Sequence, residues 1–162
     1  KNELEYLYKI FKDTFKNIDS EKIEKNKIRI KFIGNLFLLP EDLRLLCEKL
    51  EEETRKNNNF IVNFAIAYGG RQELIMAVRK ILKNKVKEEN IDEKLIEKNL
   101  YNASPPDLII RTGGEKRTSN FLPWQSAYSE WIFLDKMWPE FEKEDLINCV
   151  EEFKKRKRNF GG

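Results

Sequence analysis

The sequence contains no histidine and only two cysteines, Cys47 and Cys149, which lie about a hundred positions apart. The absence of histidine excludes Ser-His-Asp and Cys-His catalysis and zinc sites built from Cys and His ligands. Any catalysis must therefore use Asp, Glu, Lys, Arg, Tyr or Ser. Isolated cysteines are typical of reduced core residues rather than of disulfides or reactive thiols. We therefore expect a reducing, cytoplasmic environment.

The sequence also lacks any long apolar stretch. No run approaches the roughly 18–20 apolar residues of a membrane-spanning helix, and no signal-peptide core follows the charged start. We expect a protein that neither spans a membrane nor is secreted. The 162 residues, 40% hydrophobic and 36% charged, fit one compact domain over residues 1–162, which is large enough to bury a core without disulfides.

Charge is nearly balanced, and the net charge of +3 comes from the C-terminal end. Such a basic run can bind nucleic acid or an anionic membrane surface. A solvated helix end, whose cations interact favourably with the helix dipole, is the commoner case and the one we favour. The run comprises Lys154, Lys155, Arg156, Lys157 and Arg158, after Glu151 and Glu152.

Helix-like and strand-like segments alternate along the chain. Apolar residues recur every three or four positions in the expected helices, and short apolar runs mark the expected strands. The nearly continuous apolar run at 60–67 is typical of a parallel strand buried on both faces. The alternation predicts an α/β fold in which helices flank a central, mainly parallel sheet. We expect strands at 28–33, 60–67, 107–111 and 130–134, and helices within 4–15, 40–57, 74–81, 92–100 and 142–157.

Two of the expected strands end in loops that contain paired glycines and an arginine. Ligands of open α/β sheets bind beyond the carboxyl ends of the strands, so residues 68–71 and 111–120 are the first places to look. Glycines let backbone N–H groups approach an anion, and the second loop adds side-chain donors that suit a phosphate or diphosphate. These donors are Arg111, Lys116, Arg117, Thr118 and Ser119.

Arg111 is the sharpest feature of the second loop. A guanidinium at the end of an apolar strand is costly unless an anion or a carboxylate pairs with it. The alternative to an anion site is a structural ion pair with Asp107 or Glu115, and the residues alone favour neither interpretation. The paired glycines match neither the Walker pattern nor GxGxxG.

Glu130 begins a strand that is otherwise apolar, where a carboxylate seldom lies without a partner. A diphosphate site usually needs Mg²⁺ held by one or two carboxylates and substrate oxygens, and Glu130 is a candidate ligand. Pairing with an arginine of residues 111–117 explains it equally well. A nearby group of aromatic residues is most simply core rather than a platform for stacking bases. This group comprises Phe121, Trp124, Tyr128, Trp131, Phe133 and Trp138.

An ordered set of motifs runs from residue 106 to residue 130. It comprises PDLIIRTGGE at 106–115, Arg117, SNF at 119–121, WQ at 124–125, AY at 127–128 and Glu130. The set resembles the C-terminal signature of the cis-prenyltransferases, the undecaprenyl diphosphate synthase family. YGGR at 68–71, WPEF at 138–141 and RNFGG at 158–162 also resemble that family, so the similarity covers essentially the whole chain.

The resemblance implies a magnesium-dependent, homodimeric transferase of isoprenoid biosynthesis with an α/β fold. Such an enzyme adds isopentenyl diphosphate units to an allylic polyprenyl diphosphate with Z stereochemistry. Arg111, Arg117 and Ser119 match the family's residues that bind isopentenyl diphosphate, and Thr118 lies in the same loop. Glu130 matches its metal-binding glutamate.

The same resemblance assigns roles to larger parts of the chain. The apolar faces of the first two helices and the central strands would wall a tunnel for the growing chain. The lipid product would bring the protein into contact with a membrane surface. The basic C-terminal segment would cross the dimer interface toward the partner's site, which displaces the nucleic-acid interpretation.

The chain departs from the family pattern in two places. The family's phosphate loop, of the Asp-Gly-Asn-Gly-Arg-Trp kind, is not in these 162 residues, nor are the following His and the Phe-Ser-x-Glu-Asn-Trp segment. That loop holds the allylic diphosphate and supplies a metal-binding aspartate, so no catalytic residue is identified. We expect an N-terminally incomplete domain that is inactive by itself. The second departure is Lys116, where bacterial members often carry His.

A non-catalytic partner subunit of a hetero-oligomeric prenyltransferase is the main alternative. Accessory subunits of this family usually lose the Arg, Ser and Glu set, whereas Arg111, Arg117, Ser119 and Glu130 are all present here. A generic phosphate- or nucleic-acid-binding domain rests only on the glycine loops and the basic end. We expect no nucleic-acid binding.

Overall fold

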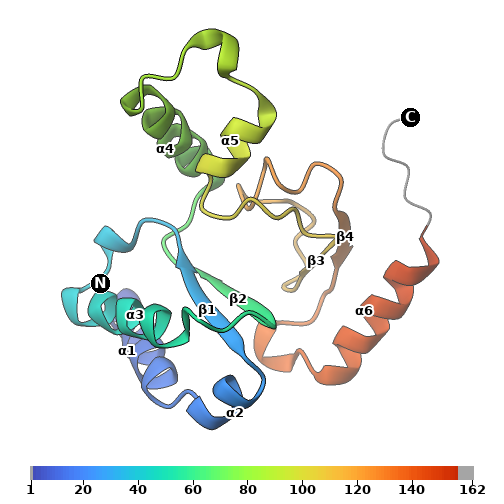
Figure 1. Cartoon of the computed structure of the whole chain (residues 1–162). Coiled ribbons are helices and arrows are strands. Elements are labelled where there is room, and N and C mark those ends of the chain that lie inside the picture. Colours follow the sequence, from blue (N-terminus) through green and yellow to red (C-terminus); the bar gives the residue numbers. More distant parts are fainter. Residues whose placement is uncertain (1, 157–162) are drawn as a thin grey trace. The chain divides into compact units, whose positions relative to one another are not determined.

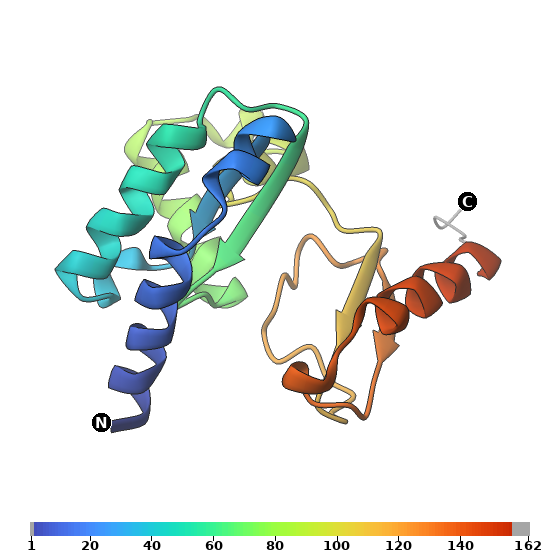
Figure 2. The same cartoon turned by 90° about the horizontal axis from the view of Figure 1, so that it is seen from below.

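The computed structural model describes residues 2–156, so Lys157, Arg158 and the RNFGG motif lie outside the described residues. The chain divides into two compact units, unit 1 (Lys1–Tyr68) and unit 2 (Gly69–Gly162). Each unit contains one pair of parallel strands with helices beside it (Figures 1 and 2). The predicted α/β class with parallel strands and flanking helices is therefore confirmed, while the single domain over residues 1–162 stays a prediction.

Unit 1 is built around an apolar core. Its elements are α1 (Asn2–Lys16), α2 (Ser20–Lys25), β1 (Ile28–Ile33), α3 (Glu41–Thr54) and β2 (Phe60–Ala65). Helices α2 and α3 pack on β1, and α1 packs on α3. The stripe of α1 brings Phe15 into the core, where its ring meets Phe32 of β1 and Phe64 of β2 edge to face, at centroid distances of 5.0 and 5.2 Å.

Strands β1 and β2 pair in parallel from Ile28 opposite Phe60 to Ile33 opposite Ala65. Two polar side chains at or just after the C-terminal end of α3 form hydrogen bonds with the backbone of β1. Thr54 Oγ1 accepts a hydrogen bond from the backbone N–H of Ile30 at 3.0 Å, and Asn57 Nδ2 donates to the carbonyl of Ile28 at 2.9 Å. Asparagines 57–59 follow α3, and Asn57 also supports the neighbouring strand.

The prediction that β2 is buried on both faces is wrong. Phe60, Ile61 and Val62 are 60%, 56% and 40% exposed. Within unit 1, β2 pairs only with β1, so its other edge has no strand partner among the described residues of that unit. A strand is covered on both faces only when further strands and helices flank it, and here one apolar strand has a single neighbour.

Unit 2 is organised around a shorter pair of strands. Its elements are α4 (Gly70–Lys83), α5 (Glu93–Asn99), β3 (Leu108–Arg111), β4 (Glu130–Phe133) and α6 (Lys143–Lys155). Strands β3 and β4 pair in parallel from Leu108 opposite Glu130 to Arg111 opposite Phe133. The 18 residues between them contain neither helix nor strand. This long loop begins at the carboxyl end of β3 and carries most of the predicted site.

The aromatic group of unit 2 is not core, contrary to prediction. Tyr128 is 63% exposed and Trp138 is 73% exposed. Their rings contact other aromatic rings or line a pocket instead; Trp138, for example, stacks on Phe141 at a centroid distance of 5.7 Å. In the described part of the chain, every helix is too short or too polar to cross a bilayer.

Candidate functional site

A pocket of about 320 Å³ lies where β3 ends and the long loop begins. Three of the predicted binding residues, Arg111, Thr118 and Ser119, line it together. Apolar side chains of β3 and β4, together with Thr112 and Phe121 of the loop, form the rest of the wall. The lining residues are Ile109, Ile110, Arg111, Thr112, Thr118, Ser119, Phe121 and Trp131.

The Arg111 guanidinium forms hydrogen bonds with the loop that follows β3. Its Nη1 donates to Ser119 Oγ at 2.9 Å and also to the carbonyl of Arg117. A guanidinium has five N–H donors in a planar fork. Among the described residues both hydrogen bonds use Nη1, so Nε and Nη2 remain for an anion. The arrangement orients one end of the guanidinium and leaves the other for a ligand.

The structure does not support the ion-pair explanation of Arg111. Glu115, one suggested partner, pairs with Arg117 Nη1 instead. Asp107, the other, precedes β3, while Arg111 ends it. Four residues of extended chain separate the two positions by roughly 13 Å. The acceptors that Arg111 contacts, a hydroxyl and a carbonyl, are uncharged, so the positive charge is not neutralised by them.

The backbone N–H groups of Gly113 and Gly114 do not face an anion, contrary to prediction. Gly113 N donates to the carbonyl of Lys136 at 2.8 Å, and Gly114 N donates to the carbonyl of Leu134 at 2.9 Å. Both glycines have positive φ, +94° and +74°. Glycine adopts this conformation without steric cost, so the pair forms the turn that holds the loop against residues 134–136.

The two glycine loops meet at Asn120. Its side-chain Oδ1 accepts from Arg71 N at 2.9 Å, and its carbonyl accepts from Gly70 N at 2.9 Å, so it satisfies two free N–H groups at the start of α4. A Cβ on Gly70 would lie 1.9 Å from Pro123 Cδ, so only glycine fits there. Asn120 has φ +64°, a conformation in which asparagine is enriched. The sequence analysis assigned no role to Asn120. The only local signal for one is that asparagine adopts positive φ more readily than most residues.

Arg117 and Lys116 lie on the same loop but are not among the residues that line the pocket. The Arg117 side chain is 62% exposed and pairs with Glu115. Its contribution in this structure is the carbonyl that accepts from Arg111. The role of its guanidinium in holding isopentenyl diphosphate stays a prediction.

Glu130 is not brought into this pocket. It lies opposite Leu108, whereas Arg111 lies opposite Phe133, so about 10 Å of strand separates the carboxylate position from the carboxyl end of β3. Its Oε2 accepts from Arg156 Nη1 at 2.8 Å. Glu130 therefore has an arginine partner, but one from the end of α6 rather than from residues 111–117.

Arg156 makes a small network around Glu130. It also donates to the carbonyl of Trp131 at 3.1 Å and pairs with Glu152. The hydrogen bond to Glu130 is the main reason that the pKa of Arg156 is raised, and the hydrogen bond to Glu152 adds to it. The sequence placed Arg156 in a basic run, expected to be a solvated helix end or, by resemblance, to cross a dimer interface, and did not pair it with Glu130.

The described residues contain no group of three Asp, Glu or Cys side chains close enough to hold a metal ion. Glu130, at the start of β4, offers one carboxylate next to the site strands. Mg²⁺ commonly binds one or two carboxylates, with water and phosphate oxygens completing its shell. The residues present therefore fit one protein ligand of such a site.

Unit 1 has an apolar pocket of about 210 Å³ between α2 and the two strands. The sequence predicted that the first helices and the central strands wall a lipid tunnel, and this pocket is a candidate segment of such a wall. Phe15, on the apolar face of the first helix, is packed in the core and does not line this pocket. The lining residues are Ile18, Asp19, Lys22, Ile23, Ile28, Ile30, Val62 and Phe64.

Comparison with protein families gives one clear result. The family model described as "Putative undecaprenyl diphosphate synthase" matches residues 1–161. The chain is 45% identical over 168 aligned positions to a tritrans,polycis-undecaprenyl-diphosphate synthase (geranylgeranyl-diphosphate specific) of Thermococcus kodakarensis, and 44% identical over 170 to that of Methanocaldococcus jannaschii. These alignments cover 99% of the chain but 64% and 61% of the two relatives, so the chain spans less than two thirds of their length.

Solved structures agree with the sequence relatives. A "probable undecaprenyl diphosphate synthase" from Campylobacter jejuni superposes with a TM-score of 0.90 at 33% identity, covering 100% of this chain and 76% of that one. Lavandulyl diphosphate synthase from Lavandula x intermedia, solved with dimethylallyl diphosphate, gives a TM-score of 0.92 at 31% identity, covering 100% and 72%.

Proposed function

The chain belongs to the undecaprenyl diphosphate synthase family, and on this basis we propose that the protein containing it is a cis-prenyltransferase. The reaction condenses isopentenyl diphosphate with an allylic polyprenyl diphosphate. A carbon–carbon bond forms between the two prenyl units, the allylic diphosphate leaves, and loss of a proton creates the new Z double bond. The relatives named above are all synthases, so nothing favours the non-catalytic partner over the enzyme.

The Arg111 pocket is the observation that carries this proposal. Among residues 2–156 its guanidinium has only uncharged partners, and Thr118 and Ser119 line the same pocket. A diphosphate supplies the missing negative charge and accepts from the remaining N–H groups. Such binding would hold the alkene of isopentenyl diphosphate in place for attack on the allylic carbon. Arg117 would join Arg111 in this role once its side chain turns from Glu115 to the ligand.

We assign geranylgeranyl diphosphate as the allylic primer. Support comes from the two archaeal relatives at 44–45% identity, which are described as specific for it. The primer's diphosphate would bind outside the residues described above, on the phosphate loop that this sequence lacks. Competition between geranylgeranyl and farnesyl diphosphate in a single reaction tests the assignment.

Mg²⁺ is the proposed cofactor, with Glu130 as one ligand. When bound, the ion would offset the charge that develops on the diphosphate leaving group. Glu130 must first exchange its hydrogen bond with Arg156 for the metal. Glu130→Gln in the complete protein should therefore raise the Mg²⁺ concentration needed for half-maximal turnover by at least tenfold. An unchanged requirement would remove Glu130 from the metal site.

We further propose a cytoplasmic homodimer that meets membranes only through its lipid product. Cys47 and Cys149 are both buried and free, and burial raises the pKa of the Cys47 thiol to about 11, so it stays protonated and unreactive near neutral pH. This chemistry suits a reducing compartment. Sedimentation analysis of the complete protein tests the dimer. A nucleic-acid binding assay at several salt concentrations tests the expectation that the protein does not bind nucleic acid.

The 162-residue chain alone should not turn over substrate, because its sequence holds the isopentenyl diphosphate residues but not the family's phosphate loop. A longer chain that restores this loop should be active. Radiolabelled isopentenyl diphosphate, geranylgeranyl diphosphate and Mg²⁺ provide the assay for both. Product formation by the 162 residues would contradict this part of the proposal.

Arg111→Ala in the complete protein is the central test. Loss of a charge-assisted contact worth about 1.5–3 kcal/mol should raise the KM for isopentenyl diphosphate by roughly 10- to 100-fold, while the thermal midpoint changes little. Lys116→Ala is the matched control, since it removes a cation from the same loop without touching the pocket. If Arg111→Ala lowers stability and activity in parallel, or if Lys116→Ala has the same kinetic effect, the pocket is not the isopentenyl diphosphate site.

A further inference from the structure

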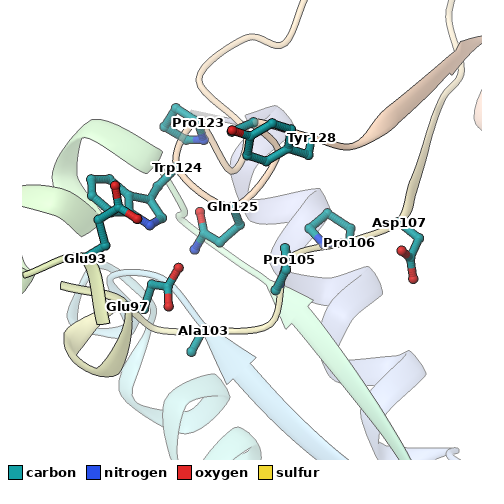
Figure 3. Close-up of a pocket in the computed structure, with 11 residues that line it drawn as sticks. Glu93, Glu97, Ala103, Pro105, Pro106, Asp107, Pro123, Trp124, Gln125 and Tyr128 are labelled. Carbon is teal, nitrogen blue, oxygen red and sulfur yellow. The ribbon is translucent and has the colours of Figure 1, made fainter. Parts of the chain in front are cut away.

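Unit 2 has a second and larger pocket, of about 570 Å³, between α5 and the C-terminal half of the long loop (Figure 3). None of the predicted site residues Arg111, Arg117, Thr118, Ser119 and Glu130 lines it. Its polar wall comes from Glu93, Glu97, Asp107 and Gln125, and its aromatic wall from Trp124 and Tyr128. The function proposed above assigns nothing to this pocket.

Glu93 and Glu97 place two negative charges on one face of α5. They lie four positions apart, which brings side chains of a helix next to each other. Neither forms an ion pair or a hydrogen bond through its side chain with another described residue. Two adjacent like charges destabilise a helix slightly unless a cation lies between or near them. The pocket therefore offers an unneutralised negative wall.

Gln125 contributes a buried acceptor that has no donor. The residue is 4% exposed, and its Nε2 donates to Glu73 Oε2 at 3.1 Å and to the carbonyl of Asn102 at 2.9 Å. Because both partners are acceptors, the amide cannot be turned the other way, so Oε1 is the remaining atom. Oε1 is buried and has no hydrogen-bond partner among the described residues. Figure 3 shows the Gln125 side chain projecting between Trp124 and Glu97, among the residues that line the pocket.

The aromatic residues favour an organic ligand. Trp124 is half-buried and Tyr128 is largely exposed, and both line the pocket. Aromatic ring faces attract cations, Trp most strongly. A metal ion fits poorly, because the carboxylates line a wide pocket and no three acidic side chains of the described residues gather around one point. The site combines negative charge, aromatic faces and one acceptor that needs an N–H donor.

We propose that this pocket binds an organic ammonium cation that carries N–H groups, such as a primary alkyl diamine. One ammonium group donates to Gln125 Oε1 and lies near the rings, and the carboxylates of Glu93 and Glu97 neutralise its charge or that of the second amine. A quaternary ammonium satisfies the charge and the rings but has no N–H for Gln125. This distinction makes the proposal specific.

Calorimetric titration of the full 162-residue chain tests the proposal. The probes are 1,4-diaminobutane, choline as a cation without N–H, and 1,4-butanediol as a neutral analogue, each at low and at physiological salt. We expect the diamine to bind with a one-to-one stoichiometry, choline at least fivefold more weakly, and the diol not at all. Since this assay needs no prenyl substrate, its outcome is independent of the proposed enzyme activity.

A pair of double variants separates the site from general electrostatics. Glu93→Gln with Glu97→Gln removes the two carboxylates that α5 contributes to the pocket and should weaken diamine binding at least tenfold. Glu88→Gln with Glu89→Gln makes the same change of charge in the same unit outside the pocket, and should leave binding within twofold. Circular dichroism checks that both variants remain folded.

Several results would overturn the proposal. Equal weakening by the two double variants would mean nonspecific attraction by negative charge. Choline binding as tightly as the diamine would exclude the hydrogen bond to Gln125, and Mg²⁺ displacing the diamine at equal concentration would indicate a metal site. A crystal structure grown with the diamine that shows only water at Gln125 Oε1 would also reject the site.

Discussion

The two units of this chain differ in the contacts that order their strands and loops. Unit 1 has six residue pairs between its strands and a core of aromatic and aliphatic side chains. Unit 2 has four residue pairs between its strands, and the 18 residues that join them have no regular structure. Both units bury apolar side chains, but in unit 2 hydrogen bonds from a few polar side chains also position the functional loops.

The core of unit 1 illustrates the first case. Phe15, Phe32 and Phe64 meet at centroid distances between 5.0 and 5.4 Å, and Leu43 and Cys47 are completely buried beside them. Aromatic pairs in such geometries add to the energy of burial. Burial of apolar side chains needs no precise direction, so a stripe of apolar residues in the sequence is sufficient to predict such a core.

The loops of unit 2 illustrate the second case. Glu73 is 1% exposed; its Oε1 accepts from Tyr101 N at 2.7 Å and its Oε2 accepts from Gln125 at 3.1 Å. Ser129 Oγ donates to the carbonyl of Pro106 at 2.6 Å. Each contact joins residues that are at least 23 positions apart. The loop therefore depends on single hydrogen bonds that a point substitution can remove.

The largest effect is expected in the core of unit 1. Phe15→Ala should destabilise the chain by about 3–5 kcal/mol, because it removes a buried ring and leaves a cavity. Urea unfolding followed by circular dichroism gives the change in unfolding free energy. Phe37→Ala is the control, since Phe37 is 87% exposed and should cost less than about 1 kcal/mol. Similar losses for both variants would show that Phe15 is not a core residue.

The next largest effect is expected at Glu73 in unit 2. Glu73→Ala should cost about 2–4 kcal/mol, because the N–H of Tyr101 and the amide of Gln125 lose a buried acceptor. Glu73→Gln keeps one acceptor and should lose about half as much. Amide hydrogen exchange should show faster exchange around 101–125 but not in β1 or β2. Uniformly faster exchange in both units would contradict the idea that they depend on separate contacts.

The smallest effect is expected at Asp145, which joins α6 to the site loop. Its carboxylate accepts from Glu142 N and from Lys136 Nζ, each at 2.9 Å, and Lys136 in turn accepts from Gly113 N through its carbonyl. The hydrogen bond from Glu142, followed by that from Lys136, holds the pKa of Asp145 below its ordinary value. Asp145→Asn should lower the Tm near neutral pH by about 2 °C.

The lowered pKa of Asp145 also predicts how the Tm difference changes with pH. A carboxyl group whose pKa is lowered by folding stabilises the folded state above its ordinary pKa, and the stabilisation is lost as the pH falls through the lowered value. The Tm difference between the natural chain and Asp145→Asn should therefore shrink as the pH is lowered below about 4. A difference that stays constant or grows would exclude the ionised Asp145 as its source.

The sequence predicted the α/β class and, among residues 2–156, every strand and five of the six α-helices, because apolar spacing indicates helices and strands directly. It missed α2, whose six residues are too few to show a stripe; the capping contact of Asp19 with Lys22 N is its main local signal. It also misplaced β2 in a buried setting, since a continuous apolar run does not reveal how many strands will flank it.

The sequence predicted some of the residues that line the candidate site, but not the partners that the other predicted residues contact. Arg111, Thr118 and Ser119 line one pocket, whereas Glu130 lies beside Arg156 and the glycine N–H groups serve a turn. Nothing in the local pattern could distinguish a glycine that faces an anion from one that faces a carbonyl. The choice depends on residues 134–136, which follow β4 and lie against the turn because β4 pairs with β3.

The amino-acid sequence by itself determined the family, the alternation of elements and the loop rich in anion-binding donors, because each is written in contiguous residues. Only the tertiary structure decided which donors remain available and which are satisfied internally. Gln125 meets Glu73 across 52 residues, Arg71 meets Asn120 across 49, and Arg156 meets Glu130 across 26. A hydrogen bond depends on distance and direction in space, and sequence separation carries neither.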